Sequence, residues 1–282
     1  MGRFDDVLLT VDYDRTLTAP DSTIPERNIE AIRWFMDNGG TFTVNTGRSI
    51  STFGETMKRI PTNAPFLLYN GSATCRDGKL EHCVEIQLDV WQTVKELSEA
   101  FPDMNLEIQG ESVNYLVNQK PEYVAFYEAL GWKHAPAVPG TNIGPFMKLA
   151  LFGQIRENTV DSMFSGTPEE LHRFDEAEEQ IRRMYPGKVE VFRSAPRIID
   201  IHAKGVSKLQ AARDLQKRLG KKILVCVGDA ENDVTMLDGA DYAYCPSDGV
   251  LAHRYENVCG CAEGAVADVI YEKIPEILAF QP

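Results

Sequence analysis

The chain has no long uninterrupted apolar segment and no low-complexity region. Its 282 residues nowhere contain the run of about eighteen apolar residues that a membrane-spanning helix needs. Hydrophobic residues make up 43% of the sequence and charged residues 25%, as in ordinary folded soluble proteins. The first residues also lack an apolar export signal. We therefore expect a folded cytoplasmic protein that does not interact with membranes.

Positive charge is in short supply. The sequence has 29 Lys and Arg residues against 42 Asp and Glu residues, which gives a formal net charge of -13. A surface of this sign repels nucleic-acid backbones and anionic lipids unless a local basic patch outweighs the overall field, and no such patch is visible. Nucleic acid is therefore not an expected partner.

Cysteine and histidine are also scarce, with six and five residues. This cysteine content, with Cys226 inside an apolar strand pattern, is typical of a reducing compartment rather than of a disulfide framework. Cys259 and Cys261 are separated by a single residue, but no second Cys or His pair supports a zinc site. A lone histidine near a strand end, such as His202, is more often satisfied by its neighbours than catalytic.

What the sequence does have is a regular alternation of strand and helix patterns at both ends. Such alternation predicts a parallel sheet covered by helices on both faces. The expected strands are residues 6–12, 41–45, 65–69, 222–227 and 241–245, and the expected helices are residues 24–38, 49–60, 207–219, 232–237 and 265–279.

The middle of the chain carries strand and helix patterns of its own. We therefore predict an α/β lobe at residues 81–203, inserted into a discontinuous α/β domain formed by residues 1–80 and 204–282. The alternative is one large α/β domain without an insertion.

Four acidic residues follow two of the predicted core strands: Asp12, Asp14, Asp229 and Asp233. Ligands of open α/β sheets bind at the carboxyl ends of the strands, so these carboxylates are expected to meet in one crevice. Four carboxylates together repel one another and become protonated unless a cation compensates them. An all-oxygen set without His or Cys favours Mg²⁺.

Several motifs resemble those of the haloacid dehalogenase superfamily. In chain order they are Asp12-Tyr13-Asp14-Arg15-Thr16, a strand that ends at Thr46, a distant Lys208, and Gly228-Asp229-Ala230-Glu231-Asn232-Asp233. The surroundings of Thr46, Tyr69-Asn70-Gly71, the segment before Lys208 and the residues after Asn232 further resemble the Cof-type subfamily with a large α/β (type IIB) cap. The resemblance implies a Rossmann-like core, with the insertion as a cap over the crevice.

The resemblance also implies an activity and the roles of the acidic residues. The chain would be a Mg²⁺-dependent phosphatase that hydrolyses a small phosphorylated metabolite, such as a sugar phosphate, through an aspartyl-phosphate intermediate. Asp12 would be the nucleophile and Asp14 the general acid and base. Both would also contact the metal, Asp14 through its main-chain carbonyl. Asp229 would bind Mg²⁺, and Asp233 would complete or orient the metal site.

Phosphate binding is assigned to four further positions by the same resemblance. The Thr46 hydroxyl and the Gly47 amide would hold phosphoryl oxygens together with Lys208 and the Asn232 amide, since phosphoryl transfer depends mainly on positioning and charge neutralisation. Arg48 is an ion-pair partner or a substrate contact.

Two residues of the first motif need separate interpretation. Thr16 is expected to be structural, with its hydroxyl bonded within its own loop. Arg15 stands where the subfamily usually has Gly, so it must adopt ordinary dihedral angles or accept strain. Its side chain is expected to point to solvent, and the alternative is a contact with a second anionic group of the substrate.

Two other functions stay open from the sequence. A phosphomutase, which is an isomerase, would use a similar core and cap but return the phosphoryl group to a sugar. A non-catalytic phosphate-binding or regulatory protein is disfavoured, because Asp12, Asp14, Lys208 and Asp229 are all present.

Overall fold

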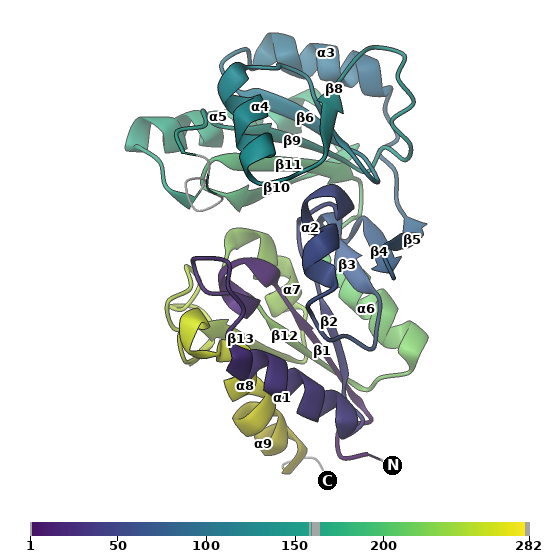
Figure 1. Ribbon diagram of the computed structural model, residues 1–282, viewed down its shortest axis with the longest axis vertical. Helices are drawn as coiled ribbons and strands as arrows, with labels where there is room; N and C mark the ends of the chain where they lie inside the picture. The colour runs from purple at the N-terminus through teal and green to yellow at the C-terminus, as the bar shows by residue number, and fades with distance from the viewer. Residues whose placement is uncertain (1, 158, 160–163, 280–282) are drawn as a thin grey trace. The chain divides into compact units, whose positions relative to one another are not determined.

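The computed structural model describes residues 2–157, 159 and 164–279 (Figure 1). The chain forms two compact units, each of which contains both helices and strands. The first unit comprises Met1–Thr46, Thr56–Lys79 and Ser207–Pro282, and the second comprises Gly47–Glu55 and Leu80–Val206. The expected fold class, a Rossmann-like parallel-sheet core with an inserted α/β domain, is confirmed. Residues 47–55 group with the second unit, although the sequence assigned them to the first.

The first unit is built on a five-stranded sheet in which every neighbouring pair is parallel. The strand order is β14-β13-β12-β1-β2, and the strands are β1 (Val7–Val11), β2 (Thr41–Val44), β12 (Ile223–Val227), β13 (Tyr242–Pro246) and β14 (Glu256–Val258). All residues of β1 and β12 are buried, as in a parallel sheet covered on both faces. Val11 pairs with Val227, so these two strands end side by side.

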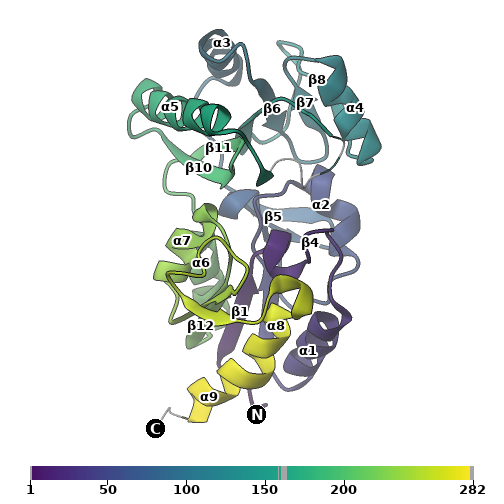
Figure 2. The ribbon, with the colours of Figure 1, turned by 90° about the vertical axis from the view of Figure 1, so that its left-hand side faces the viewer.

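Helices cover both faces of this sheet, as Figure 2 shows with the sheet seen nearly edge-on. On one face α1 (Glu26–Asp37) packs against α8 (Ala265–Asp268) and β2, and on the other α6 (Lys208–Leu219) packs against α7 (Val234–Asp238) and β12. The single closing helix predicted at 265–279 is interrupted by a π-helical turn at Val269–Lys273, after which α9 (Ile274–Ala279) continues.

A small antiparallel element adjoins the parallel sheet. The strands β3 (Phe66–Leu68), β4 (Ala73–Arg76) and β5 (Lys79–Cys83) form a sheet in that order, and a parallel bridge between Asn45 and Leu67 joins β3 to the end of β2. Sequence analysis missed β4, β5, β14 and the strand at His134–Pro136. Most residues of β5, β14 and His134–Pro136 are exposed or half-buried, so these strands carry no apolar alternation, whereas β4 alternates over only four residues.

The second unit contains a six-stranded, mostly antiparallel sheet in the order β10-β11-β9-β6-β7-β8. Its strands are β6 (Asn105–Gln109), β7 (Asn114–Leu116), β8 (His134–Pro136), β9 (Lys148–Phe152), β10 (Val189–Ala195) and β11 (Ile198–Ala203). Its helices are α3 (Val90–Ala100), α4 (Pro121–Ala129) and α5 (Pro168–Met184), and α2 (Ile50–Met57) begins in this unit.

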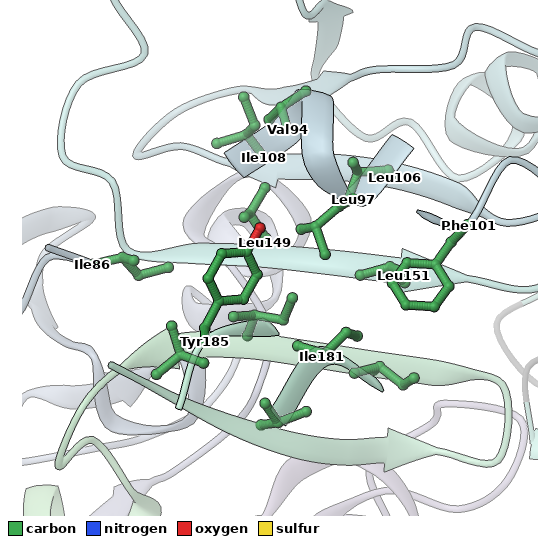
Figure 3. Packing of buried hydrophobic residues seen from close by; sticks show 14 of the residues in the cluster. Ile86, Val94, Leu97, Phe101, Leu106, Ile108, Leu149, Leu151, Ile181 and Tyr185 are labelled. Carbon is green, nitrogen blue, oxygen red and sulfur yellow. The ribbon is translucent and has the colours of Figure 1, made fainter. Parts of the chain in front are cut away.

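Alternate residues of β9 belong to two apolar clusters, which lie on opposite faces of this sheet. Leu149 and Leu151 pack with side chains of α3 and α5, as Figure 3 shows for Leu97 and Ile181. Ala150 and Phe152 belong to a second cluster, which includes residues of α4. The period of two along the strand therefore decides which helix covers which face.

Two sequence-based expectations concern the chain as a whole. Within the described residues, no helix combines the length and apolar character needed to cross a membrane. All six cysteines lie in the described part and are free thiols, as expected. Burial raises the pKa of Cys259 and of Cys261 to about 12, so both thiols are protonated at neutral pH.

Candidate active site

Asp12 lies at the point where the two central strands end. Its backbone amide donates to the carbonyl of Val227 at 2.9 Å, which continues the pairing of β1 with β12 by one residue. The residue is 6% exposed. The sheet itself therefore fixes this carboxylate at its carboxyl edge, as the sequence predicted.

Lys208 binds two of the predicted carboxylates at once. It is the first residue of α6, whose N-terminus is capped by the Ser207 side chain. Its Nζ lies 2.5 Å from Asp12 Oδ1 and 2.7 Å from Asp233 Oδ1, and all three side chains are buried. Burial lowers the pKa of Lys208, but the charges of Asp12 and Asp233 outweigh this effect and raise that pKa above its ordinary value. Lys208 is therefore a fixed positive charge.

Asp233 is held in place through its other oxygen. Asp233 Oδ2 accepts hydrogen bonds from the backbone amides of Asp229 (3.1 Å) and Ala230 (3.2 Å). A Cβ on Gly228 would lie 2.6 Å from Asp233 Cγ, so this position has no room for a side chain. The two oxygens of Asp233 therefore organise Lys208 and the loop after β12.

Asp229 is oriented by a residue far away in the sequence. The Thr16 hydroxyl donates to Asp229 Oδ1 at 2.8 Å, although the two residues are 213 positions apart. The expectation that Thr16 bonds only within its own loop is wrong, because the turn after β1 brings the hydroxyl to the loop after β12. Thr16 thus belongs to the site as a positioning residue.

Three of the four predicted carboxylates form a group suited to a metal ion. Oxygens of Asp12, Asp229 and Asp233 lie within 4.8 Å of one another. Burial raises the pKa of Asp12 to about 7. The positive charge of Lys208 lowers this pKa in part, and the neighbouring carboxylates raise it further. Burial and the charges of Asp12 and Asp233 raise the pKa of Asp229 well above its ordinary value. The donor set is hard, all-oxygen and short of positive charge, so it fits Mg²⁺.

Asp14 lies outside that group. It is half-buried in the turn Tyr13–Leu17, and its charge is one of the causes that raise the pKa of Asp12. The structure thus places Asp14 close enough to Asp12 to interact electrostatically.

A second turn links Thr46 to Asn232 through Asn70. The amide of Asn70 donates to the Thr46 carbonyl at 3.0 Å, and Asn232 Nδ2 lies 3.4 Å from Asn70 Oδ1. Tyr69, Asn70 and Gly71 in this turn all have positive φ, at 53°, 52° and 96°. Strained backbone of this kind is found preferentially at functional sites.

Asn45 is a site residue to which the sequence analysis gave no role. Its Nδ2 donates to the Lys208 carbonyl at 2.8 Å, and it is fully buried. The available signal was an amide side chain at the carboxyl end of a predicted strand, directly before Thr46. Asn45 therefore links the end of β2 to the start of α6.

Gly47 and Arg48 belong to the second unit, unlike the other predicted site residues. The carbonyl of Gly47 accepts a hydrogen bond from Lys148 Nζ at 2.9 Å, and the Arg48 guanidinium lies 5.9 Å from the centre of the Trp132 ring. The structure therefore groups Asp12, Asp229, Asp233, Lys208, Thr46 and Asn232 in the first unit, and describes Gly47 and Arg48 with the second.

A comparison of the sequence with protein families is consistent with this site. The family model described as haloacid dehalogenase-like hydrolase matches residues 9–250, which is most of the chain and includes all the residues above. The chain belongs to the haloacid dehalogenase-like hydrolases. The predicted membership of this superfamily is thus confirmed, and with it the expectation of an enzyme.

Relatives of this hydrolase include characterised and solved proteins. It is 21% identical over 236 residues to 5-amino-6-(5-phospho-D-ribitylamino)uracil phosphatase YcsE of Bacillus subtilis (strain 168), covering 83% of this chain and 80% of that one. The structure of SMU.1108c from Streptococcus mutans UA159 has a TM-score of 0.78 at 19% identity, with 95% and 98% of the two chains covered. The subclass IIB sugar phosphatase BT4131 has a TM-score of 0.74 at 18% identity, with 96% and 99% covered. These two likenesses show the fold, and the predicted type IIB cap is consistent with the subclass in the name of BT4131.

Proposed function

We propose that this hydrolase is a Mg²⁺-dependent phosphatase that acts on a small phosphorylated metabolite, such as a sugar phosphate, through an aspartyl-phosphate intermediate. The observation that carries the proposal is the buried contact of Lys208 with Asp12 and Asp233 beside Asp229. The Bacillus subtilis relative and BT4131 are both named as phosphatases, which supports the reaction class.

Asp12, Asp229 and Asp233, with the main-chain carbonyl of Asp14, would hold the metal. Bound there, Mg²⁺ would neutralise charge on the carboxylates and on the transferring phosphoryl group. The elevated pKa values of Asp12 and Asp229 support a cation site, because a nucleophilic carboxylate must be ionised.

In the first step, one oxygen of Asp12 attacks phosphorus while the bond from phosphorus to the ester oxygen breaks. Asp14, protonated, gives its proton to the leaving oxygen. In the second step, water attacks the phosphorus of the aspartyl phosphate and gives a proton to Asp14, and the carboxylate of Asp12 is released. Atoms and charges balance, and both aspartates return to their starting states.

Phosphate binding is assigned to four further groups of the chain. Lys208 supplies a fixed positive charge, and the Thr46 hydroxyl, the Gly47 amide and the Asn232 amide supply hydrogen-bond donors. Arg48 is proposed as a substrate contact.

The first test is a set of sugar phosphates assayed with Mg²⁺, with free phosphate and isomerised sugar both measured. Asp12→Asn should lower kcat by about 10³-fold or more, because an amide oxygen is a poor nucleophile. Asp37→Asn, an exposed position of α1, is the matched control and should leave kcat unchanged.

Two outcomes would contradict the proposal. Isomerised sugar without free phosphate would identify a mutase instead. In a rapid acid quench with labelled substrate, a phosphoryl label on a residue other than Asp12 would refute the assigned nucleophile.

A further inference from the structure

Lys148 is a buried lysine with two polar contacts inside the second unit. It begins β9 and is 4% exposed. Its Nζ forms an ion pair with Asp200 Oδ2 at 2.7 Å and donates to the carbonyl of Gly47 at 2.9 Å. Lys148 therefore joins the strand β11, which carries Asp200, to the segment that follows Thr46.

Asp200 is the ion-pair partner that holds this lysine. It is fully buried on β11, and its Oδ2 also accepts a hydrogen bond from the Ser194 hydroxyl. Burying an ion pair costs desolvation, and replacing such a pair by apolar side chains of similar volume is often neutral or stabilising. Stability alone is thus a weak explanation for this arrangement, whereas a requirement for one defined geometry explains it directly.

The same segment has a second attachment to the second unit. Asn114 Oδ1 on β7 accepts hydrogen bonds from Ser49 Oγ at 3.2 Å and Ser51 Oγ at 2.5 Å. Asn114 is in turn held by its Nδ2, which donates to the Tyr127 hydroxyl at 2.8 Å. Residues 47–51 are therefore anchored at both ends to the sheet of this unit.

Gly47 needs such an anchor because it has no side chain. A glycine populates more backbone conformations than any other residue, and this freedom opposes a fixed orientation of its amide. The Gly47 N–H lies in the preceding peptide plane, so the hydrogen bond from Lys148 to the Gly47 carbonyl restricts the orientation of this N–H through the φ and ψ angles of Gly47.

We propose that Lys148, held by Asp200, is a positioning residue that orients the phosphate-binding segment at Gly47. This inference rests on the proposed function, in which the Gly47 amide binds a phosphoryl oxygen. Lys148 acts through the backbone, so its loss should weaken binding of any phosphoryl group, whatever the rest of the substrate.

The experiment uses the full chain and removes the pair as a unit. Lys148→Met with Asp200→Asn avoids leaving an unpaired buried charge. The KM for p-nitrophenyl phosphate and the inhibition constant of inorganic phosphate should both rise about tenfold or more, as expected for a misplaced phosphoryl-oxygen donor. Lys204→Met is the matched control, because Lys204 is an exposed lysine of the same unit paired with Glu190 at 2.7 Å. It should leave both constants unchanged.

A second variant covers the case in which the double variant fails to fold. Asp200→Asn alone is isosteric and weakens the contacts of Asp200 with Lys148 and with the Ser194 hydroxyl, while Lys148 itself stays in place, so both constants should rise by a smaller factor. Lys148→Arg keeps a positive charge beside Asp200, so it should lose less affinity for phosphate than the double variant. Unchanged inhibition by phosphate in a folded variant that lacks the pair would overturn the inference.

Failure of the role proposed for Lys148 can be distinguished from failure of the proposed phosphatase function. A wild-type chain that hydrolyses no phosphate ester contradicts the proposed function. A wild-type chain that is active, together with variants that bind phosphate equally well, contradicts only the role of Lys148.

Discussion

Arg15 occupies a backbone conformation that its side chain disfavours. Its φ is 58° and its ψ is 12°, in the turn that carries Asp14 and Thr16. Of the two possibilities weighed from the sequence, ordinary dihedral angles or strain, the structure shows the strained one. A residue with a Cβ in this region costs about 1–2 kcal/mol relative to the right-handed conformation.

Arg15→Gly and Arg15→Ala form a pair that isolates this strain. Both variants lose whatever the guanidinium contacts, but only Gly relieves the backbone. We expect the free energy of unfolding of Arg15→Gly to exceed that of Arg15→Ala by about 1 kcal/mol, measured by urea unfolding. Equal stability of the two would show that the turn carries no strain.

His202 has no catalytic role in this scheme but should affect stability. It is fully buried in β11, and burial, assisted by the nearby charge of Lys148, lowers its pKa to about 3. A histidine that is neutral when folded and has an ordinary pKa of 6.5 when unfolded stabilises the fold above pH 6.5. This stabilisation is lost as the pH falls from 6.5 towards 3.

His202 should make the free energy of unfolding depend on pH. Between pH 7 and pH 5 this one group should remove about 2 kcal/mol of the free energy of unfolding. His202→Gln cannot titrate, so its loss over the same interval should be smaller by that amount in urea unfolding at the two pH values. A variant with the same slope as the wild type would mean that His202 is protonated in the folded protein.

Among the elements, the turn after β3 determines where α6 can begin. Gly71 has φ of 96°, and a Cβ built on it would lie 2.4 Å from the carbonyl oxygen of Ser207, the N-cap of α6. This close approach sets the position of the helix whose first residue is Lys208. The glycine is therefore required both by its conformation and by the space available.

Gly71→Ala should consequently affect both stability and catalysis. We expect a loss of about 2–4 kcal/mol in the free energy of unfolding and a clear drop in kcat/KM, because Ser207 and Lys208 must move. Gly78→Ala is the control. Gly78 also has positive φ, at 75°, but nothing lies within 4 Å of the added Cβ, so only a backbone cost of about 1 kcal/mol is expected. Equal effects of the two substitutions would contradict the steric argument.

At the scale of the molecule, binding of Mg²⁺ should stabilise the fold against unfolding. A ligand at one hundred times its dissociation constant stabilises by about 2.7 kcal/mol, so the Tm should rise with MgCl₂ above that in chelator. Because the pKa of Asp12 is raised to about 7, the metal must displace a proton at pH 6, and the stabilisation should increase from pH 6 to pH 8. Asp229→Asn should abolish most of the shift. A Tm that is insensitive to Mg²⁺, or an equal shift in Asp229→Asn, would count against the metal site.

The sequence by itself determined the fold class and most of the candidate site. The buried strand β12 is a continuous apolar run, and β1 is one apart from Thr10. The helices beside them carry apolar residues at helical spacing, so side-chain periodicity specifies each element locally. The positions of Asp12 and Asp229 at the ends of these strands then follow from the geometry of a parallel sheet.

Only the tertiary structure decided which residues contact one another across large sequence separations. It connected Thr16 to Asp229 and Asn45 to the Lys208 carbonyl, and it grouped Gly47 with Lys148 rather than with the carboxylates. No local pattern encodes these contacts, because they depend on where the strands and turns end in space. A hydrogen bond extends only about 3 Å, so displacements too small to alter any periodicity decide whether it forms.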